Sequence, residues 1–99
     1  MGGMPKAYVI VDVEVTDPET YEEYKRLSTA ATEQYGGRFL VRGGAVTVAE
    51  GDWEPHRLVV LEFADAEAAR RWYESPEYTE ARAVRQRSST SSLLFVDGA

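Results

Sequence analysis

The sequence predicts a small α+β domain in which helices cover one face of a single antiparallel sheet. Strand-like and helical patterns follow one another in the order β-α-β-β-α-α-β over 99 residues, so that two helical crossovers separate the strands. The first and third strands, Ala7–Val15 and Arg57–Phe63, are the most apolar and should therefore lie at the centre of the sheet. These features predict a ferredoxin-like sandwich with a four-stranded antiparallel sheet in the order 4-1-3-2.

The first strand and the helix after it have clear signals. Apolar side chains alternate along one face of the strand, at Ala7, Val9, Val11, Val13 and Val15. Asp17 offers a capping oxygen and Pro18 fits a first helical turn, which predicts a helix from there to about Glu33. Gly36 and Gly37 end this helix, because glycine adopts the left-handed conformation that closes many helices.

Glycine pairs and a turn mark the second strand. The strand begins as Arg38–Arg42 and meets a bulge or bend at Gly43-Gly44. The alternating pattern then continues over Ala45–Glu50, where the strand is expected to resume. A turn over residues 51–55 leads into the third strand.

The C-terminal part should form two helices and a last strand. Asp65 supplies a capping oxygen for the first of these helices, and Ser75-Pro76 interrupts the helical pattern. The expected bounds are Asp65 to about Glu74 for the first helix, Glu77 to about Ser88 for the second, Ser88–Ser92 for a serine-rich loop and Leu93–Val96 for the strand.

Two strand segments are apolar on both faces. Leu58–Leu61 and Leu93–Val96 present apolar side chains to either side of the sheet, although the helices of such a sandwich cover one face only. The open apolar face needs a cover, and a second copy of the chain provides one. We therefore expect a homodimer joined through the open face of the sheet.

The net charge and the shortness of the apolar runs argue against several classes of partner and against a membrane span. The net charge is −6, which disfavours nucleic acid and anionic membrane surfaces as partners. The longest apolar run is too short to span a bilayer and the N-terminus has no apolar signal core, so a cytoplasmic protein is expected. Residues 1–99 should form one domain, with residues 1–5 as a flexible N-terminal extension.

Several kinds of site lack the residues that they need. The chain has no cysteine, no asparagine and a single histidine, His56, which follows Pro55 in an expected turn. The chain therefore has too few histidine and cysteine residues for a transition-metal centre or for a Ser-His-Asp or Cys-His triad, and its one histidine is poorly placed to bind haem. Neither glycine pair resembles a phosphate-binding loop. We expect no metal and no cofactor.

Arginine and aromatic residues remain as candidates for chemistry. Arg82 and Arg85 are three residues apart on the last helix, Tyr78 lies one turn earlier, and Trp72 precedes the proline break. Arg42 lies on the second strand, four residues after Arg38 and therefore on the same side of it. Guanidinium groups beside aromatic rings suit a small carboxylate or enolate, so these five residues are predicted to form a ligand site between the sheet and the last two helices. In the alternative interpretation the arginines form surface ion pairs and the aromatic residues pack in the core.

Six short motifs resemble those of a known family. They are Lys6-Ala7-Tyr8-Val9-Ile10, Tyr35-Gly36-Gly37-Arg38, Val41-Arg42-Gly43-Gly44, Glu50-Gly51-Asp52-Trp53, Val59-Val60-Leu61-Glu62-Phe63 and Trp72-Tyr73-Glu74-Ser75-Pro76-Glu77-Tyr78. With these motifs the chain resembles the bacterial family called domain of unknown function 1330, from Lys6 to about Gly98. The resemblance implies a ferredoxin-like subunit of a dimeric α+β barrel, and it implies no established reaction.

Two classes of function stay open. The first is a cofactor-independent enzyme that acts on a small aromatic or enolisable acid, with tyrosine and arginine in acid–base and oxyanion roles. The second is a non-catalytic dimeric module that binds a small anionic metabolite or serves as an accessory or stress subunit. An enclosed pocket at the predicted site would favour a ligand, and a solidly packed interior would favour a structural role.

Overall fold

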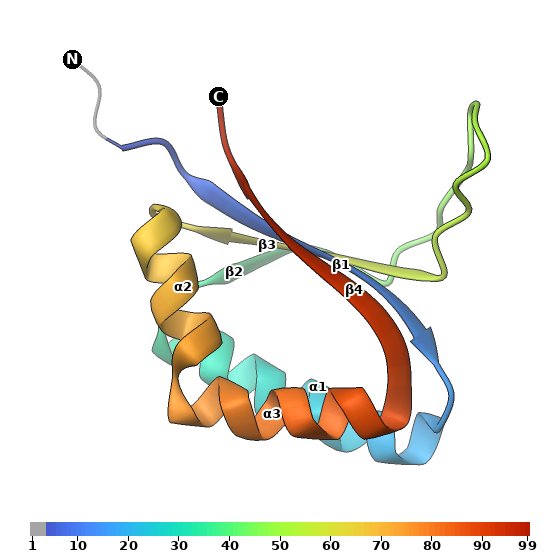
Figure 1. Ribbon diagram of the computed structural model, residues 1–99, viewed down its shortest axis with the longest axis horizontal. Coiled ribbons are helices and arrows are strands. Elements are labelled where there is room, and N and C mark those ends of the chain that lie inside the picture. The colour runs from blue at the N-terminus through green and yellow to red at the C-terminus, as the bar shows by residue number, and fades with distance from the viewer. Residues whose placement is uncertain (1–3) are drawn as a thin grey trace.

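The computed structural model describes residues 4–99 and shows one sheet with all of its helices on the same side (Figure 1). The elements are β1 (Ala7–Val15), α1 (Pro18–Gln34), β2 (Arg38–Arg42), β3 (Arg57–Phe63), α2 (Ala66–Glu74), α3 (Pro76–Ser88) and β4 (Ser89–Asp97). The strands lie in the order β2-β3-β1-β4 and every neighbouring pair is antiparallel. The predicted ferredoxin-like fold and the strand order 4-1-3-2 are therefore confirmed.

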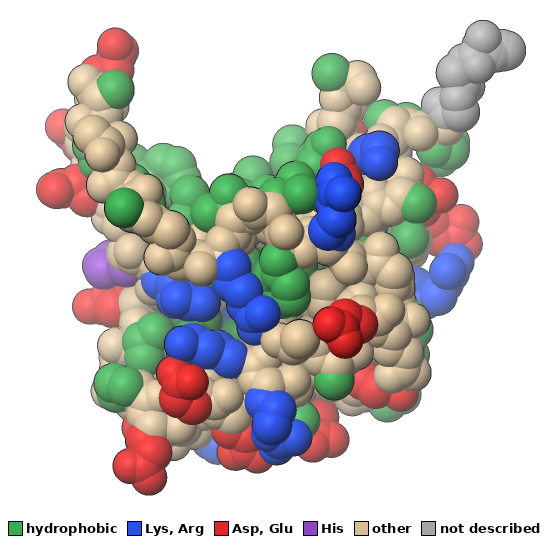
Figure 2. All heavy atoms as spheres, turned by 180° about the vertical axis from the view of Figure 1, so that it is seen from behind, with side chains coloured by type: hydrophobic (Ala, Val, Ile, Leu, Met, Phe, Trp, Pro, Cys, Tyr) green, Lys and Arg blue, Asp and Glu red, His purple; other side chains and the backbone are tan. Residues whose placement is uncertain are grey.

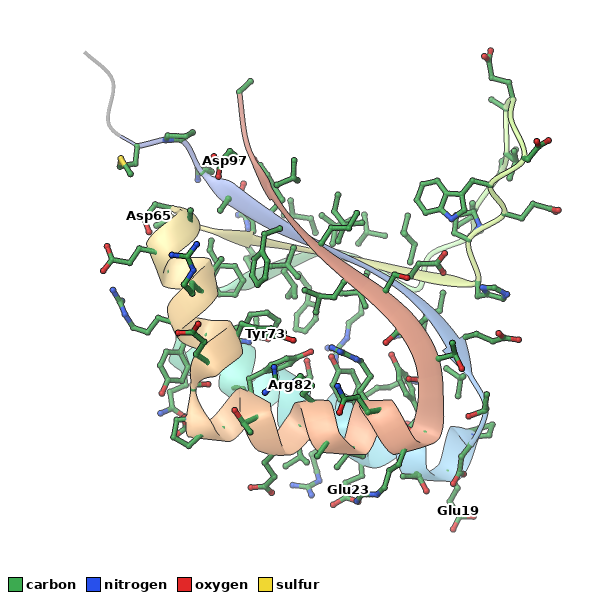
Figure 3. All side chains as sticks on the ribbon, in the orientation of Figure 1. Glu19, Glu23, Asp65, Tyr73, Arg82 and Asp97 are labelled. Carbon is green, nitrogen blue, oxygen red and sulfur yellow. The ribbon has the colours of Figure 1, made fainter. Side chains whose placement is uncertain are left out.

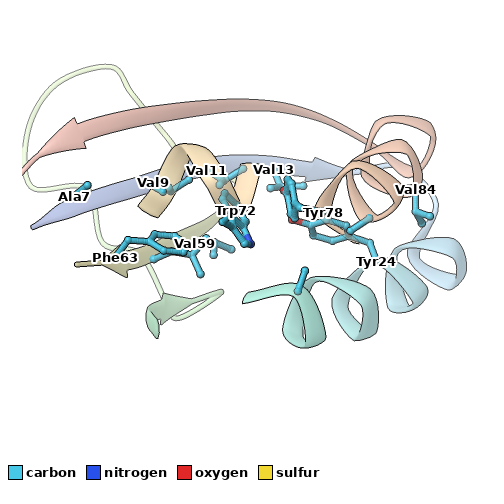
Figure 4. Packing of buried hydrophobic residues seen from close by; sticks show 14 of the residues in the cluster. Ala7, Val9, Val11, Val13, Tyr24, Val59, Phe63, Trp72, Tyr78 and Val84 are labelled. Carbon is cyan, nitrogen blue, oxygen red and sulfur yellow. The ribbon is translucent and has the colours of Figure 1, made fainter. Parts of the chain in front are cut away.

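The core lies between the sheet and the helices. Alternate residues of β1 and β3 are buried, because successive side chains of a strand point to opposite faces. The helices contribute large aromatic residues to the same layer, among them Trp72, whose ring centroid is 5.2 Å from that of Phe63 (Figure 4). Burial of these side chains is the main favourable contribution to folding.

Side-chain caps fix the start of each helix. The Asp17 carboxylate accepts a hydrogen bond from the Thr20 amide at the start of α1, and the Asp65 carboxylate accepts one from the Ala68 amide at the start of α2. Gly36, with φ of 78°, follows α1 in the left-handed conformation that the sequence predicts there.

Two predicted boundaries are wrong. Ala45–Glu50 does not resume the strand: residues 44–56 form neither helix nor strand and project away from the sheet (Figure 1). The serine-rich segment is also not a loop, because β4 begins at Ser89 rather than at Leu93. β1 extends to Val15 and pairs with Ser89, so its backbone provides hydrogen-bond partners along the whole serine-rich segment.

The face of the sheet opposite the helices is uncovered. Its central side chains are apolar: Ile10 lies opposite Val60 on one side and Leu94 on the other. Leu94 is 58% exposed and Val96 is 45% exposed, which is unusual for apolar residues in adjoining positions. Hydrophobic side chains form a broad floor on this face between the projecting loop and the termini (Figure 2).

Residues 1–3 of the predicted N-terminal extension, residues 1–5, lie outside the described residues, and Met4 and Pro5 are exposed. Within residues 4–99, no helix has the length and apolar character needed to cross a membrane.

Candidate functional site

A narrow hollow lies between α1 and the side of the sheet formed by β2 and β3. It is lined by Val11, Val13, Tyr21, Tyr24, Lys25, Ser28, Phe39, Arg42, Arg57, Val59 and Leu61. Its volume is about 10 Å³, which is room for about one water molecule. Basic side chains gather around the mouth of this hollow (Figure 2).

Arg42 reaches the mouth from the end of β2. It lies in register with Val59 on the helix-facing side of the sheet, and its guanidinium carbon is 4.0 Å from the centroid of the Phe39 ring. Its Nη2 donates hydrogen bonds to the Lys25 carbonyl at 3.1 Å and to the Thr29 hydroxyl at 2.7 Å. Both partners belong to α1, so Arg42 ties the second strand to the first helix without a carboxylate.

Arg57 reaches the hollow from the start of β3. It occupies the same side of the strand as Val59 and Leu61, so a cation stands in a row that is otherwise apolar. Its guanidinium carbon lies 5.7 Å from the centroid of the Tyr21 ring, and its buried Nε has no hydrogen-bond partner. Gly43, with φ of 73°, makes room for this side chain, because a Cβ at position 43 would clash with the guanidinium.

The lining of the hollow is positively charged. Lys25, Arg42 and Arg57 belong to it, and no Asp or Glu of residues 4–99 does. Glu22, on the outer side of Lys25, is 2.8 Å from the lysine Nζ, and this hydrogen bond holds the pKa of the Glu22 carboxyl below its usual value. One carboxylate thus faces three cations, which favours an anion at the mouth although the whole chain is acidic.

A buried network of hydroxyl groups leads from the hollow into the core. Tyr24 lines the hollow, and its hydroxyl oxygen is 2.8 Å from that of Tyr78. The Nη1 of Arg85 donates a hydrogen bond of 2.6 Å to the Tyr78 hydroxyl. Tyr78 is fully buried and Arg85 is 5% exposed (Figure 4 shows Tyr24 and Tyr78 side by side). Within residues 4–99, Arg85 has no carboxylate at salt-bridge distance, and its Nε has no hydrogen-bond partner.

This network can donate hydrogen bonds and is poorly suited to accept a proton. Burial, followed by the neighbouring Tyr24 hydroxyl, raises the pKa of Tyr78, so Tyr78 stays protonated at neutral pH. Because Arg85 donates to the Tyr78 oxygen, Tyr78 can direct its own proton to Tyr24. The proton of Tyr24 is then available to an acceptor in the hollow, and each bond of such a chain polarises the next.

The five residues predicted as one site lie in three different surroundings. Trp72, Tyr78 and Arg85 are together in the core, where the ring centroids of Trp72 and Tyr78 are 4.0 Å apart. Arg42 lies at the mouth of the hollow beside α1. Arg82 is half-buried over Tyr73, with its guanidinium carbon 4.5 Å from the ring centroid (Figure 3).

Hydrogen bonds of Ser75 close the proline break between α2 and α3. The Ser75 hydroxyl donates to the Trp72 carbonyl at 2.7 Å and accepts from the Tyr78 amide at 3.1 Å. Ser75 therefore ends α2 and caps α3 in one step, and Pro76 occupies the first turn of α3. The aromatic residues on either side of the break pack against each other.

Sequence reasoning missed most of the hollow. Helical spacing indicates only that Tyr21 and Tyr24 lie on the packing face of their helix, and no local pattern marks Lys25 or Phe39 as a lining residue. One signal was present: Arg57 begins a strand in which every second residue, Val59, Leu61 and Phe63, is buried. A cation in the buried register of an apolar strand indicates a site or a buried partner.

Among residues 4–99, no group of three His, Cys, Asp or Glu side chains could hold a metal ion. His56 is exposed, 3.7 Å from the Asp12 carboxylate and 4.0 Å from that of Glu14.

Solved structures share this fold at low sequence identity. A protein of unknown function from Rhodopseudomonas palustris, RPA0582, is 20% identical with a TM-score of 0.77, over 98% of this chain and 85% of that one. SnoaB, a cofactor-independent oxygenase from Streptomyces nogalater, is 16% identical with a TM-score of 0.70, over 96% and 94% of the two chains. A hypothetical protein of Arabidopsis thaliana is 15% identical with a TM-score of 0.69, over 98% and 90%. At these identities the likeness establishes the fold alone, a four-stranded antiparallel sheet with helices on one face.

The search of curated proteins found no match. The family pattern described as domain of unknown function (DUF1330) matches residues 6–99, almost the entire sequence. The chain belongs to this family.

Proposed function

We propose that the protein is a homodimer, joined through the open sheet face, and that it binds a small aromatic or enolisable carboxylic acid in the hollow beside α1 and acts on it without a cofactor. The observation that carries this proposal is the lining of the hollow. Lys25, Arg42 and Arg57 supply positive charge, Tyr21 and Phe39 supply aromatic walls, and carboxylates are absent from the lining formed by residues 4–99.

The carboxylate of the ligand belongs at the mouth. Arg57 can offer a planar pair of N–H donors to it. Arg42 can add single donors from Nε and Nη1, because its Nη2 already donates to two groups of α1, and the charge of the mouth is not neutralised from within the hollow. The aromatic body of the ligand would then lie between α1 and β2. The hollow must widen to admit a ring, and the long side chains at its mouth are the groups with the freedom to move.

The network of Tyr24, Tyr78 and Arg85 suits a ketone group next to the carboxylate of such a ligand. A ketone oxygen that reached Tyr24 would receive a hydrogen bond strengthened by Tyr78 and Arg85. Donors of this kind stabilise the enolate that forms when solvent water or hydroxide takes a proton from the carbon next to the ketone. The structural likeness to SnoaB supports chemistry that needs no cofactor.

Exchange of the carbon-bound protons of phenylpyruvate in heavy water tests this activity. Phenylpyruvate is aromatic, enolisable and a carboxylate, and NMR follows the loss of its CH₂ protons. We expect the protein to accelerate the exchange and Tyr24→Phe to reduce the acceleration about tenfold or more. Tyr35→Phe is the matched control, because Tyr35 bonds to Glu77 rather than to the network, and it should leave the rate unchanged.

The non-catalytic alternative has one specific observation in its favour. Among residues 4–99, no histidine or carboxylate that could take a proton from carbon lines the hollow. A protein that binds phenylpyruvate and benzoate but leaves the exchange rate at that of buffer would be a carboxylate-binding module rather than an enzyme. Failure to bind either acid would remove both functions.

A further inference from the structure

The connection between β2 and β3 is an arm that the single chain leaves uncovered. We define the arm as residues 44–56, which stand away from the sheet on the side opposite the helices (Figure 1). Val46 and Val48 are each 42% exposed, and Trp53 is 61% exposed. Ala45–Glu50 has the alternation of a strand, yet it pairs with no strand of the described chain. The arm therefore presents apolar side chains and a backbone that pairs with no strand formed by residues 4–99.

The base of the arm is held firmly in place. The Asp12 carboxylate accepts hydrogen bonds from the Trp53 Nε1 at 3.0 Å and from the His56 amide at 2.9 Å. At the other end, the Gly43 amide donates to the Leu58 carbonyl at 2.9 Å. These contacts attach both ends of the arm to β1 and β3, so that the arm rises beside the open apolar face of the sheet and borders its hydrophobic floor (Figure 2).

Charge is distributed unevenly along this open side. Glu50, Asp52 and Glu54 make the arm acidic. At the opposite end of the sheet, Lys6 and Arg38 both pair with the single carboxylate of Glu62, at 3.7 Å and 3.0 Å. Lys6, Arg38 and Glu62 together therefore leave one net positive charge at that end of the open face. A second copy whose strands run in the opposite direction would place its arm at this end.

We propose that the arm is a clasp for a second copy of the chain. In this arrangement the two open faces meet around a two-fold axis that runs across the strands, and each arm lies along the partner's sheet toward the partner's Lys6 and Arg38. The apolar side chains of the arm then contact the partner's apolar floor, and the acidic part of the arm lies near the partner's Lys6 and Arg38. The two-fold axis repeats these contacts for the second arm. This inference rests on the proposed homodimer and adds the element that holds it together.

The clasp also connects dimer formation to the candidate site. Arg42 lies two residues before the arm and Arg57 directly follows it, and both line the hollow. Docking of the arm on a second copy would fix the segments that carry these two arginines. The mouth of the hollow is thus expected to take its final form only in the dimer.

Sedimentation of arm variants tests the clasp. Val46→Asp combined with Val48→Asp places two charges where the partner's apolar floor is expected, and should weaken the dimer about a hundredfold. Thr79→Asp combined with Ala83→Asp is the control, because it adds the same two charges at exposed positions of α3, on the helical side of the sheet. It should leave the dimer unchanged. In the same samples the emission of Trp53 should shift to the blue on dimerisation, while Trp72 is already fully buried.

A second pair of variants tests the orientation. Asp52→Lys with Glu54→Lys should weaken the dimer about tenfold or more at low salt, and Lys6→Glu with Arg38→Glu should restore part of that loss. Glu19→Lys with Glu23→Lys changes the net charge equally but on the outer side of α1, where Figure 3 shows both side chains pointing away from the sheet. This control should not change the dimer.

The outcomes separate the clasp from the dimer itself. A dimer that withstands both arm variants overturns the clasp and leaves the homodimer intact, whereas a wild-type monomer overturns both. The arm variant that weakens the dimer should also weaken benzoate binding about tenfold when it is monomeric. Unchanged benzoate affinity in that monomer would overturn the link between the arm and the site.

Discussion

Arg85 is the most unusual single residue of the described chain. A guanidinium in the core is normally matched by a carboxylate, because removing a cation from water is costly. In this protein the hydroxyl of Tyr78, rather than a carboxylate, accepts the hydrogen bond of Arg85. The same hydroxyl is also hydrogen-bonded to Tyr24, which holds it in position. The core thus keeps a cation that can contribute to the binding of an anion nearby.

Replacing Tyr78 by phenylalanine should destabilise the protein more than replacing Tyr24. Tyr78→Phe removes the acceptor of Arg85 and leaves a buried cation without a partner, at a cost of about 2–4 kcal/mol in the free energy of unfolding. Tyr24→Phe keeps that acceptor and should cost about 1 kcal/mol. Urea unfolding of both variants gives the comparison. Equal costs would mean that the Arg85–Tyr78 bond contributes little.

The neighbouring glycines Gly43 and Gly44 form a natural test pair. Gly43→Ala combines a positive φ with a clash against Arg57, whereas a Cβ on Gly44 meets no atom within 4 Å. We expect Gly43→Ala to cost about 1–2 kcal/mol and to weaken benzoate binding by displacing Arg57. Gly44→Ala should have little effect on either quantity. Thermal unfolding and calorimetric titration measure both, and similar results for the two variants would contradict the proposed role of Gly43.

At the scale of elements, the sequence predicted every helix and strand that packs on the core. Periodicity, capping residues and the glycine after α1 suffice for this, because each reflects a local cause. The two errors concern partners. Ala45–Glu50 has a strand pattern but no adjacent strand among residues 4–99, whereas Ser89–Ser92 has a loop composition but a continuous partner in β1. Pairing depends on residues far away in the sequence.

The candidate site was less predictable than the fold. The sequence places Arg42 on the second strand, but the position of its guanidinium between helix and sheet depends on the register across β2 and β3, which shifts between Phe39 and Val41. Spacing along the helix grouped Arg82 with Arg85, although one side chain lies over Tyr73 and the other enters the core. A spacing of three residues, which leaves two side chains about 60° apart around a helix, does not ensure a shared environment.

The base of the arm should loosen in acid. The hydrogen bond from the His56 amide, followed by that from Trp53, holds the pKa of Asp12 below its usual value. A carboxyl group whose pKa is lower in the folded state than in the unfolded state stabilises the folded state at any pH above its unfolded pKa of about 4. This stabilisation is lost as the pH falls through the pKa that the group has in the folded state. We therefore expect the fluorescence anisotropy of Trp53 to fall below about pH 4 before the core unfolds. Asp12→Ala should show low anisotropy already at pH 7, and high anisotropy in that variant would contradict this role of Asp12.

For the whole molecule, the open sheet face is the dominant feature. A chain of this size buries a limited core, and the apolar floor between the arm and the termini adds surface that a partner would remove from water. If a homodimer forms through this face, stability depends on concentration. The midpoint of thermal unfolding should rise over a hundredfold increase in protein concentration, as measured by calorimetry. A constant midpoint together with a monomeric mass in light scattering would contradict the dimer.

The central claim is that the basic hollow beside α1 holds a carboxylate. The most direct measurement is the dissociation constant of benzoate by calorimetric titration of the wild type, of Arg57→Met and of Arg87→Met. Both variants remove one positive charge, but Arg57 lines the hollow and Arg87 is exposed on α3. We predict that Arg57→Met binds benzoate about tenfold or more weakly than the wild type, and that Arg87→Met binds it equally well. Equal affinity of all three proteins for benzoate, or no binding by any of them, would contradict the account.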